Sequence, residues 1–247
     1  MKLEFSQSFE ETERAEGINQ EYLERIEHSL EEEVERILNE EEKLGEGKTA
    51  RVFSIAASRF PLPVCVKIWK RHVLRMQDED LIEYRKMQYS SPQDEFQLQD
   101  DLYRNGFTKI PRPIAFGMKG EYQVLAMEEL PGYTLEEIAA AGATVDGAQW
   151  KDLERLVYDL NIKKGVVHRD LGKQNIFLKT GAELKEDATV AGELYLIDFG
   201  LSKKIAGSPE PDDYRLTIGN NVIRYQSDRG MVEALKPAPG RNNLFAR

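Results

Sequence analysis

Apolar side chains recur at every fourth position near the start of the chain. They are Ile18, Tyr22, Ile26, Leu30, Val34 and Leu38. A spacing of four keeps side chains on one slowly drifting helical stripe, so the pattern predicts an amphipathic helix. Glutamates fill much of its other surface. We interpret that surface as the solvated face of a helix packed on the following domain, with a docking or autoinhibitory arm as the alternative.

Shorter β-rich runs follow this helix. Residues 50–56 and 63–69 are separated by a turn containing proline and arginine, which predicts two antiparallel strands. A charged stretch at 78–105 predicts a helix, and residues 110–117 and 123–127 predict two further strands.

Pro131 and Gly132 interrupt the pattern, and we place a domain boundary there. The sequence thus predicts an acidic N-terminal extension at residues 1–42, a first lobe at 43–130 and a second lobe at 131–247. Within the second lobe, residues 150–164 carry leucine and valine at helical spacing, and Gly165 ends the predicted helix.

Composition narrows the class of protein. The chain has 247 residues, of which 40% are apolar and 32% charged, and it has no apolar run near the ~18 residues of a membrane span. Its acidic start lacks a secretion signal, and its single cysteine, Cys65, cannot form an internal disulfide. We expect a cytoplasmic protein, although a bacterial effector delivered into a host cell would share these features.

The net charge of −10 is concentrated near the N-terminus. Residues 1–46 hold 16 acidic and 5 basic side chains, whereas the remainder holds 28 acidic and 29 basic. The remainder therefore has no basic excess, which argues against nucleic acid as the main partner. Because no apolar run is long enough to cross a bilayer, we expect no membrane partner either.

The first candidate catalytic segment is the loop His168-Arg169-Asp170, which continues to Asn175. Phosphoryl transfer to a hydroxyl needs a carboxylate to accept the proton and an amide oxygen to hold a metal ion on the phosphates. Asp170 and Asn175 have this chemistry. Twenty-three residues beyond Asn175, an apolar run ends in Asp198-Phe199-Gly200, where a carboxylate beside a flexible glycine suits Mg²⁺.

Upstream, Gly45 and Gly47 lie between β-rich segments, where bare backbone N–H groups can approach phosphate oxygens. Lys67 ends the apolar run Val64-Cys65-Val66. A partly buried ammonium there needs a phosphate or carboxylate partner. The distance of Lys67 from the glycine segment along the sequence favours a role in nucleotide binding.

In their order along the chain, the glycine segment, the run ending at Lys67, the loop from His168 to Asn175 and Asp198-Phe199-Gly200 together resemble the protein-kinase superfamily over residues 43 to about 205. The resemblance implies an α+β, bilobal protein-kinase-like fold with an antiparallel five-stranded sheet and helix C in the first lobe, and a short, mainly helical second lobe. It also implies ATP and Mg²⁺. Gly45 and Gly47 would cover the phosphates, Lys67 would bind the α- and β-phosphates, Asn175 and Asp198 would hold Mg²⁺, and Asp170 would orient the acceptor hydroxyl.

Finer features are similar to the atypical RIO kinases. The segment from Gly47 and Lys48 to Val52 resembles their nucleotide loop, with Ala50 in place of a third glycine. The run Glu95-Phe96-Gln97-Leu98 resembles their helix C, which implies that Glu95 pairs with Lys67. Glu79 and Glu83 are competitors at other registers.

The segment 124–132 resembles the linker between kinase lobes. It implies Met127 as gatekeeper, with the backbone of Glu128 and Leu130 hydrogen-bonding adenine. Cys65 takes the place of a strand residue that touches adenine. We expect it to serve packing, with modification by a nucleotide-directed electrophile as the alternative.

The chain also departs from these families. Few residues follow Gly200, so the usual peptide-substrate platform is expected to be missing. Arg169 replaces the glycine of the RIO motif, Gly200 differs from the residues common there, and Lys173 sits one position later than the catalytic-loop lysine of protein kinases. Lys173 is still a candidate contact for the transferring phosphoryl group.

The leading hypothesis is a serine/threonine protein kinase of RIO-like type that acts on a protein substrate, with the acidic N-terminal helix as a candidate docking surface for an activating partner. One alternative is an ATPase or assembly switch in which Asp198 is transiently phosphorylated. Another is a small-molecule kinase of the aminoglycoside phosphotransferase type, which the intact Arg169 and Asp198-Phe199-Gly200 disfavour. A catalytically silent binding module is the weakest alternative, since no motif residue is missing.

Overall fold

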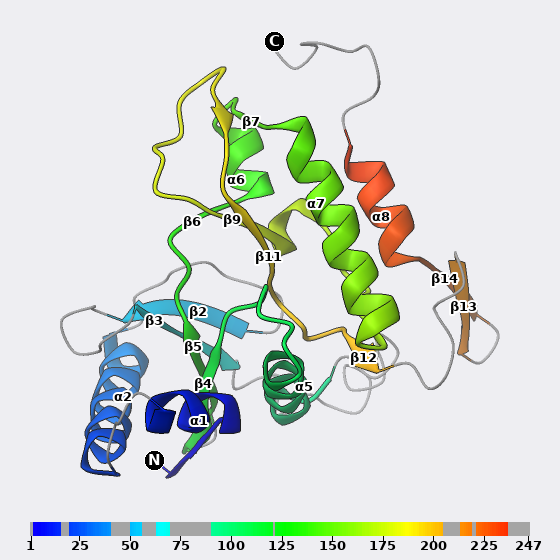
Figure 1. Ribbon diagram of the computed structural model, residues 1–247. Coiled ribbons are helices and arrows are strands. Elements are labelled where there is room, and N and C mark those ends of the chain that lie inside the picture. The colour runs from blue at the N-terminus through cyan, green and yellow to red at the C-terminus, as the bar shows by residue number, and fades with distance from the viewer. Residues whose placement is uncertain are drawn as a thin grey trace. The chain divides into compact units, whose positions relative to one another are not determined.

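The computed structural model divides the chain into two compact units (Figure 1). It describes residues 2–15, 20–40, 50–55, 63–69, 90–120, 122–204, 213–218 and 221–236. The first unit comprises Met1–Pro131 with Asp198–Leu201, and the second comprises Gly132–Ile197 with Ser202–Arg247. Within the described ranges, no helix combines the length and the hydropathy that a membrane span requires.

A five-stranded sheet forms the framework of the first unit, in the order β1-β4-β5-β3-β2. Its strands are β1 (Lys2–Phe5), β4 (Pro113–Lys119), β5 (Tyr122–Glu128), β3 (Val64–Trp69) and β2 (Ala50–Ile55). Every neighbouring pair is antiparallel. The predicted antiparallel five-stranded sheet is therefore confirmed.

Strand β1 is the member of this sheet that the sequence did not predict. It has four residues, and it pairs with β4 so that Leu3 faces Gly117 and Phe5 faces Ala115. A strand this short carries too few alternating positions to be recognised from its own pattern. The residues assigned to a separate N-terminal extension therefore include an edge strand of the first unit.

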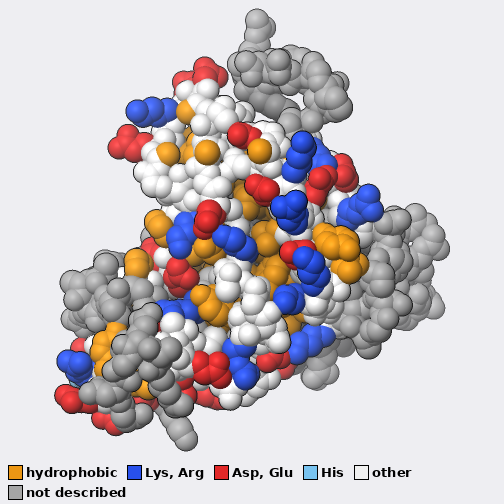
Figure 2. All heavy atoms as spheres, viewed as in Figure 1, with side chains coloured by type: hydrophobic (Ala, Val, Ile, Leu, Met, Phe, Trp, Pro, Cys, Tyr) orange, Lys and Arg blue, Asp and Glu red, His pale blue; other side chains and the backbone are white. Residues whose placement is uncertain are grey.

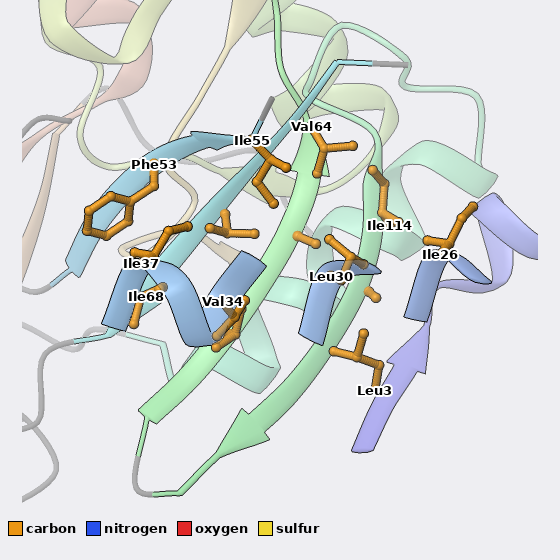
Figure 3. Packing of buried hydrophobic residues seen from close by; sticks show 14 of the residues in the cluster. Leu3, Ile26, Leu30, Val34, Ile37, Phe53, Ile55, Val64, Ile68 and Ile114 are labelled. Atoms are coloured by element: carbon orange, nitrogen blue, oxygen red, sulfur yellow. The ribbon is translucent and has the colours of Figure 1, made fainter. Parts of the chain in front are cut away.

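Helix α2 (Gln20–Glu40) lies across this sheet and closes its core (Figure 3). Ile26, Leu30 and Val34 from the predicted stripe are at most 5% exposed, and they pack with sheet residues such as Ile55 and Ile114. Burying each such side chain contributes about 1.5–3 kcal/mol. The predicted amphipathic helix is confirmed, while Ile18 lies outside the described residues.

The acidic face of α2 also has a partner in the sheet. Lys119, at the end of β4, places Nζ 3.0 Å from a carboxylate oxygen of Glu35 and 3.7 Å from one of Glu31. Half-exposed pairs of this kind contribute little to stability. They do show that two glutamates of the acidic face form ion pairs within the first unit.

Helix α5 (Pro92–Arg104) begins later than the sequence predicts. Ser91 caps it: its hydroxyl accepts from the Asp94 N–H at 3.1 Å, and Asp94 accepts in return from the Ser91 N–H. Because Pro92 sits at the first helical position and Ser90 and Ser91 are not helical, the expected continuous helix over 78–105 is wrong at residues 90–91. Residues 78–89 lie outside the described residues.

The second unit combines helices with short strand ladders (Figure 1). Its helices are α6 (Leu135–Ala140), α7 (Gly147–Tyr158), the π-helical turn η2 (Asp159–Lys163), the 3₁₀ turn η3 (Lys173–Asn175) and α8 (Asp228–Leu235). The predicted helix over 150–164 corresponds to α7 and η2. It ends at Gly165, which has a φ of +63°.

The ladders of the second unit pair strands of two to six residues. One sheet has the order β11 (Glu193–Leu196), β9 (Ile176–Lys179) and β6 (Gly132–Thr134). Pairs form between β10 (Thr189–Val190) and β7 (Thr144–Val145), between β12 (Lys203–Lys204) and β8 (Val166–Val167), and between β13 (Asp213–Ile218) and β14 (Asn221–Gln226). Of these strands, β8 and β9 flank the loop at residues 168–175, and β11 ends shortly before Asp198.

Gly132 begins the second unit in a conformation that requires glycine. Its φ is +143°, and an added Cβ would overlap the backbone carbonyl oxygen of Leu178 on β9. A side chain here would break the pairing of β6 with β9. The positive φ and the close approach to Leu178 therefore explain why glycine follows Pro131 at the predicted boundary.

Charged side chains of both signs are interspersed over the face that Figure 2 shows. This agrees with the near balance of acidic and basic residues after residue 46.

Candidate active site

Lys67 is the centre of the candidate site in the first unit. Its Nζ lies 2.8 and 3.1 Å from the two carboxylate oxygens of Glu95 and 2.9 Å from Oδ1 of Asp198. Strand β3 supplies the lysine and α5 the glutamate. The structure therefore brings together three of the residues that the sequence singled out, while the competing acids Glu79 and Glu83 lie outside the described residues.

The charges of this cluster are strongly coupled. Burial alone would lower the pKa of Lys67, but the carboxylates of Asp198 and Glu95 outweigh it and the pKa is raised. Burial raises the pKa of Glu95, and the opposing effect of Lys67 does not fully offset it. An ammonium with three carboxylate contacts in a buried setting remains protonated at neutral pH.

Asp198 adopts a backbone conformation that non-glycine residues rarely take. Its φ is +61°, and its Oδ1 also accepts a hydrogen bond from the Gly200 N–H at 3.2 Å. Gly200 in turn accepts from the Ser90 N–H at 2.7 Å, while Phe199 is fully buried. Left-handed backbone at a polar residue is typical of functional sites. Here it leaves the carboxylate half exposed beside Lys67.

The strands around Lys67 place apolar surface beside it. Val52 on β2 pairs across the sheet with Lys67 and is 41% exposed. Met127 on β5 is buried and pairs with Cys65. Val52, Met127 and the candidate phosphate contact Lys67 therefore belong to three neighbouring strands, whereas Leu130 lies beyond the end of β5.

Of the three backbone N–H groups that follow Met127, two donate hydrogen bonds to other described residues. The Glu128 N–H donates to the carbonyl of Arg112, and the Glu129 N–H donates to the carbonyl of Pro63, each at 2.9 Å. Within the described part of the chain, no residue accepts a hydrogen bond from the Leu130 N–H. This N–H is one of the two backbone positions that the resemblance implies for adenine.

The thiol of Cys65 has a raised pKa in this setting. Burial, assisted by the charge of Glu129, raises its pKa from the ordinary 9.0 to about 12. Its Sγ lies 3.8 Å from the Glu128 carbonyl oxygen.

Iodoacetamide at pH 8 should therefore modify native Cys65 about 10³-fold more slowly than the urea-unfolded chain, because the thiolate fraction falls tenfold per unit of pKa. Intact-mass spectrometry measures this directly, since the chain has a single cysteine. Equal rates in the native and unfolded states would contradict the prediction.

Asp170 and Asn175 meet in the second unit. The Asn175 side-chain Nδ2 donates to the Asp170 carbonyl oxygen at 2.8 Å and to its carboxylate Oδ2 at 2.9 Å. Asn175 is buried, and its carbonyl accepts from the Ile197 N–H at 3.0 Å. Because Nδ2 makes both side-chain bonds, the amide Oδ1 keeps its lone pairs for a cation.

Asp228 holds the backbone of the same loop, and the sequence analysis missed it. Its carboxylate accepts from the N–H groups of His168 at 2.6 Å and Arg169 at 2.8 Å, and from Asn161 Nδ2 at 2.9 Å. Asp228 is fully buried at the start of α8, behind the capping residue Ser227. The dipeptide Ser227-Asp228 signals a helix start, but nothing in the sequence connects it to residues some sixty positions earlier.

Two further features fix this loop. Arg169 has a φ of +71°, and the ring Nε2 of His168 lies 3.0 Å from the Ile197 carbonyl oxygen. Among the other candidate phosphate contacts, Lys173 is exposed at the start of η3.

Gly45, Gly47 and Lys48 lie outside the described residues, so their predicted contacts with phosphate stay predictions.

The comparison with protein families decides the assignment. A family model described as the protein kinase domain matches residues 38–222, about three quarters of the chain. The chain belongs to the protein kinase domain family. Lys67 and Glu95, Asp170 and Asn175, and Asp198 all fall within the matched region, whereas Asp228 lies beyond it.

Individual relatives are more distant. Serine/threonine-protein kinase pkn2 of Myxococcus xanthus is 29% identical over 105 residues, which are 42% of this chain. The match spans about a tenth of that relative's length, 11%. Among solved structures, a crystal structure of a kinase domain gives a TM-score of 0.43 at 17% identity, covering 68% of this chain and 52% of that one.

Proposed function

We propose that this chain is a serine/threonine protein kinase, which transfers the γ-phosphoryl group of ATP to a hydroxyl group of a protein. The observation that supports it most directly is the buried contact of Lys67 with Glu95 and Asp198. Removing a lysine ammonium from water is costly, and a protein keeps one at a strand centre where it binds an anionic ligand. The name of the Myxococcus relative supports the choice of serine and threonine as acceptors.

On this proposal, Lys67 exchanges partners when nucleotide binds. An ammonium donates three hydrogen bonds, and in this structure its three contacts are all with carboxylate oxygens. A phosphate oxygen would take the place of Asp198, while Glu95 would keep the lysine in position. Asp198 would then be released to hold a metal ion.

The donors present fit Mg²⁺. This ion takes one or two protein oxygens and obtains the others from phosphate and water. The half-exposed carboxylate of Asp198 in the first unit and the amide Oδ1 of Asn175 in the second unit are each an oxygen donor of the preferred kind. When bound, Mg²⁺ would neutralise phosphate charge, which is its usual part in phosphoryl transfer.

The remaining roles follow from the chemistry of each group. Asp170 would accept the proton of the substrate hydroxyl, and its bond from Asn175 Nδ2 would hold its carboxylate. The Leu130 N–H and the Glu128 carbonyl would bind the adenine edge, with Val52 and Met127 as its apolar neighbours. Lys173, Gly45, Gly47 and Lys48 would contact phosphate oxygens.

The RIO-like subtype is part of this proposal. It is supported by the similarity of residues 47–52 and of the run beginning at Glu95 to RIO sequences. The short interval between Asp198 and α8 agrees with a reduced substrate platform. The exposed glutamates of α2 would serve as a docking surface for a regulatory protein.

The decisive experiment incubates the purified chain with [γ-³²P]ATP, Mg²⁺ and a heat-treated proteome lysate. We expect label on serine and threonine of lysate proteins, and none with Asp198→Ala, as mapped by mass spectrometry. Hydroxylamine distinguishes the ATPase alternative, since it removes label from an aspartyl phosphate but leaves phosphoserine intact. Hydroxylamine-sensitive label confined to the chain itself would contradict the proposal.

A further inference from the structure

The N-terminus of α1 (Gln7–Ala15) is bound by a carboxylate from α5. Asp100 Oδ1 accepts from the Ser8 N–H at 2.9 Å, and its Oδ2 accepts from the Gln7 N–H at 3.3 Å. The Asp100 residue is 9% exposed. A carboxylate at the first turn of a helix satisfies N–H groups that have no partner within the helix and interacts favourably with its dipole. The two helices are therefore joined at a defined point.

The other end of this connection lies in the sheet. The Ser6 hydroxyl accepts from the Phe9 N–H at 3.0 Å, which caps α1, and donates to the Pro113 carbonyl at 2.6 Å. The Ser6 N–H donates to the Ile114 carbonyl at 2.8 Å, next to the pairing of β1 with β4. We call residues 2–15, which form β1 and α1, the N-terminal strap. The strap links β4 to α5.

Buried side chains fix the strap in place. Phe9 is fully buried and stacks with Phe5 at a ring-centroid distance of 5.8 Å. The guanidinium of Arg112 lies 5.1 Å from the Phe9 ring and 3.5 Å from a carboxylate oxygen of Glu13, which is itself buried. Contacts of this density make the strap a rigid part of the first unit.

Helix α5 is thus held on two different faces. Asp100 comes five positions after Glu95, which places the two side chains roughly 140° apart around the helix axis. One face contacts Lys67 through Glu95, with Gln99 Nε2 3.3 Å from Glu95 Oε1. The other face contacts the strap through Asp100. A rotation or shift of α5 that withdraws Glu95 from Lys67 would also break the Asp100 bonds.

We propose that the N-terminal strap fixes α5 in the orientation that places Glu95 on Lys67, so that Asp100 is a positioning residue for phosphoryl transfer. The inference rests on the proposed kinase function. It assigns to residues 2–15 a role in the reaction, although these residues contribute no group to the candidate site. Loss of the strap contact would release α5 and weaken the hold on the phosphate-binding lysine.

The test replaces Asp100 with alanine and measures kcat/KM for ATP with a substrate from the lysate screen. We expect a decrease of about tenfold, the scale of one misplaced positioning contact. Asp100→Asn, which retains one acceptor oxygen, should fall between Asp100→Ala and the unaltered chain. The matched control is Glu4→Gln, which removes an exposed carboxylate from the same strap and should leave kcat/KM unchanged.

A double-mutant cycle separates positioning from general destabilisation. If Asp100 acts through Glu95, then Asp100→Ala added to Glu95→Gln should lower kcat/KM no further. Additive losses in the double variant would overturn the inference. Amide hydrogen exchange supplies a readout independent of activity, since residues 92–104 should exchange faster in Asp100→Ala and at an unchanged rate in Glu4→Gln.

The outcomes distinguish the two proposals. An unaltered chain that transfers no phosphate and binds no ATP would refute the kinase function. An active chain in which Asp100→Ala changes neither kcat/KM nor exchange in α5 would refute the positioning role. If Asp100→Ala does not fold, Asp100→Asn in the same cycle with Glu95→Gln decides the question.

Discussion

Replacing Asp170 with alanine should lower kcat by about 10²–10⁴-fold while KM for ATP changes little. The expected size is that of a general base in proton transfer, and it corresponds to about 3–5 kcal/mol of lost transition-state stabilisation. Binding of ATP should persist, because on the proposal Asp170 acts on the acceptor hydroxyl and not on the nucleotide. Initial rates of ³²P transfer at saturating ATP measure the effect.

Two companion variants sharpen this experiment. Asp170→Asn keeps the shape of the side chain but removes its basicity, so it should lose nearly as much activity as the alanine variant. Asp152, an exposed aspartate on α7, is the matched control, and Asp152→Ala should keep full activity. Activity of Asp170→Ala within threefold of the unaltered chain would exclude Asp170 from the mechanism.

Replacing Asp228 with alanine should destabilise the second unit by about 2–4 kcal/mol and also lower kcat. The variant leaves the N–H groups of His168 and Arg169 buried without the acceptor that they use now. Such a loss lowers Tm by roughly 5–15 °C in a chain of this size. Urea denaturation followed by circular dichroism gives the free energy of unfolding.

The neighbouring residue provides the control for Asp228. Arg229 is exposed on the same turn of α8, so Arg229→Ala should change the free energy of unfolding by less than about 0.5 kcal/mol. The variant Asp228→Asn should be intermediate, since its amide keeps one acceptor but turns an N–H toward a donor. If Asp228→Ala unfolds at the same urea concentration as the unaltered chain, Asp228 does not hold the catalytic loop.

The local pattern of apolar and polar residues was sufficient to predict helix α2 and four strands of the first unit. The stripe through Ile26, Leu30 and Val34 predicted α2 because a helix repeats every 3.6 residues, and the alternating runs predicted four strands of the sheet. The motif residues Lys67, Asp170, Asn175 and Asp198 were found because each follows or precedes a recognisable element. Their chemistry is local, so the sequence displayed it.

The start of α5 was harder to predict. Ser91 and Pro92 form a helix-start signal within a charged stretch that favours helix throughout. The prediction gave more weight to the charged composition of residues 78–105 than to the capping signal at Ser91, and it therefore extended the helix across that signal. The cap prevailed in the folded chain because Ser91 and Asp94 satisfy each other's backbone groups.

The sequence by itself singled out the candidate side chains for binding phosphate, accepting a proton and holding a metal ion, and it predicted the helix and strands that bear most of them. Only the tertiary structure showed the contact of Glu95 with Lys67 that the resemblance had implied, the support that Asp228 gives the loop at His168, and the place of residues 2–5 in the sheet. These three facts are contacts between segments distant in the chain. Their energy comes from burial and hydrogen bonding in three dimensions, which the local pattern of apolar and polar residues does not display.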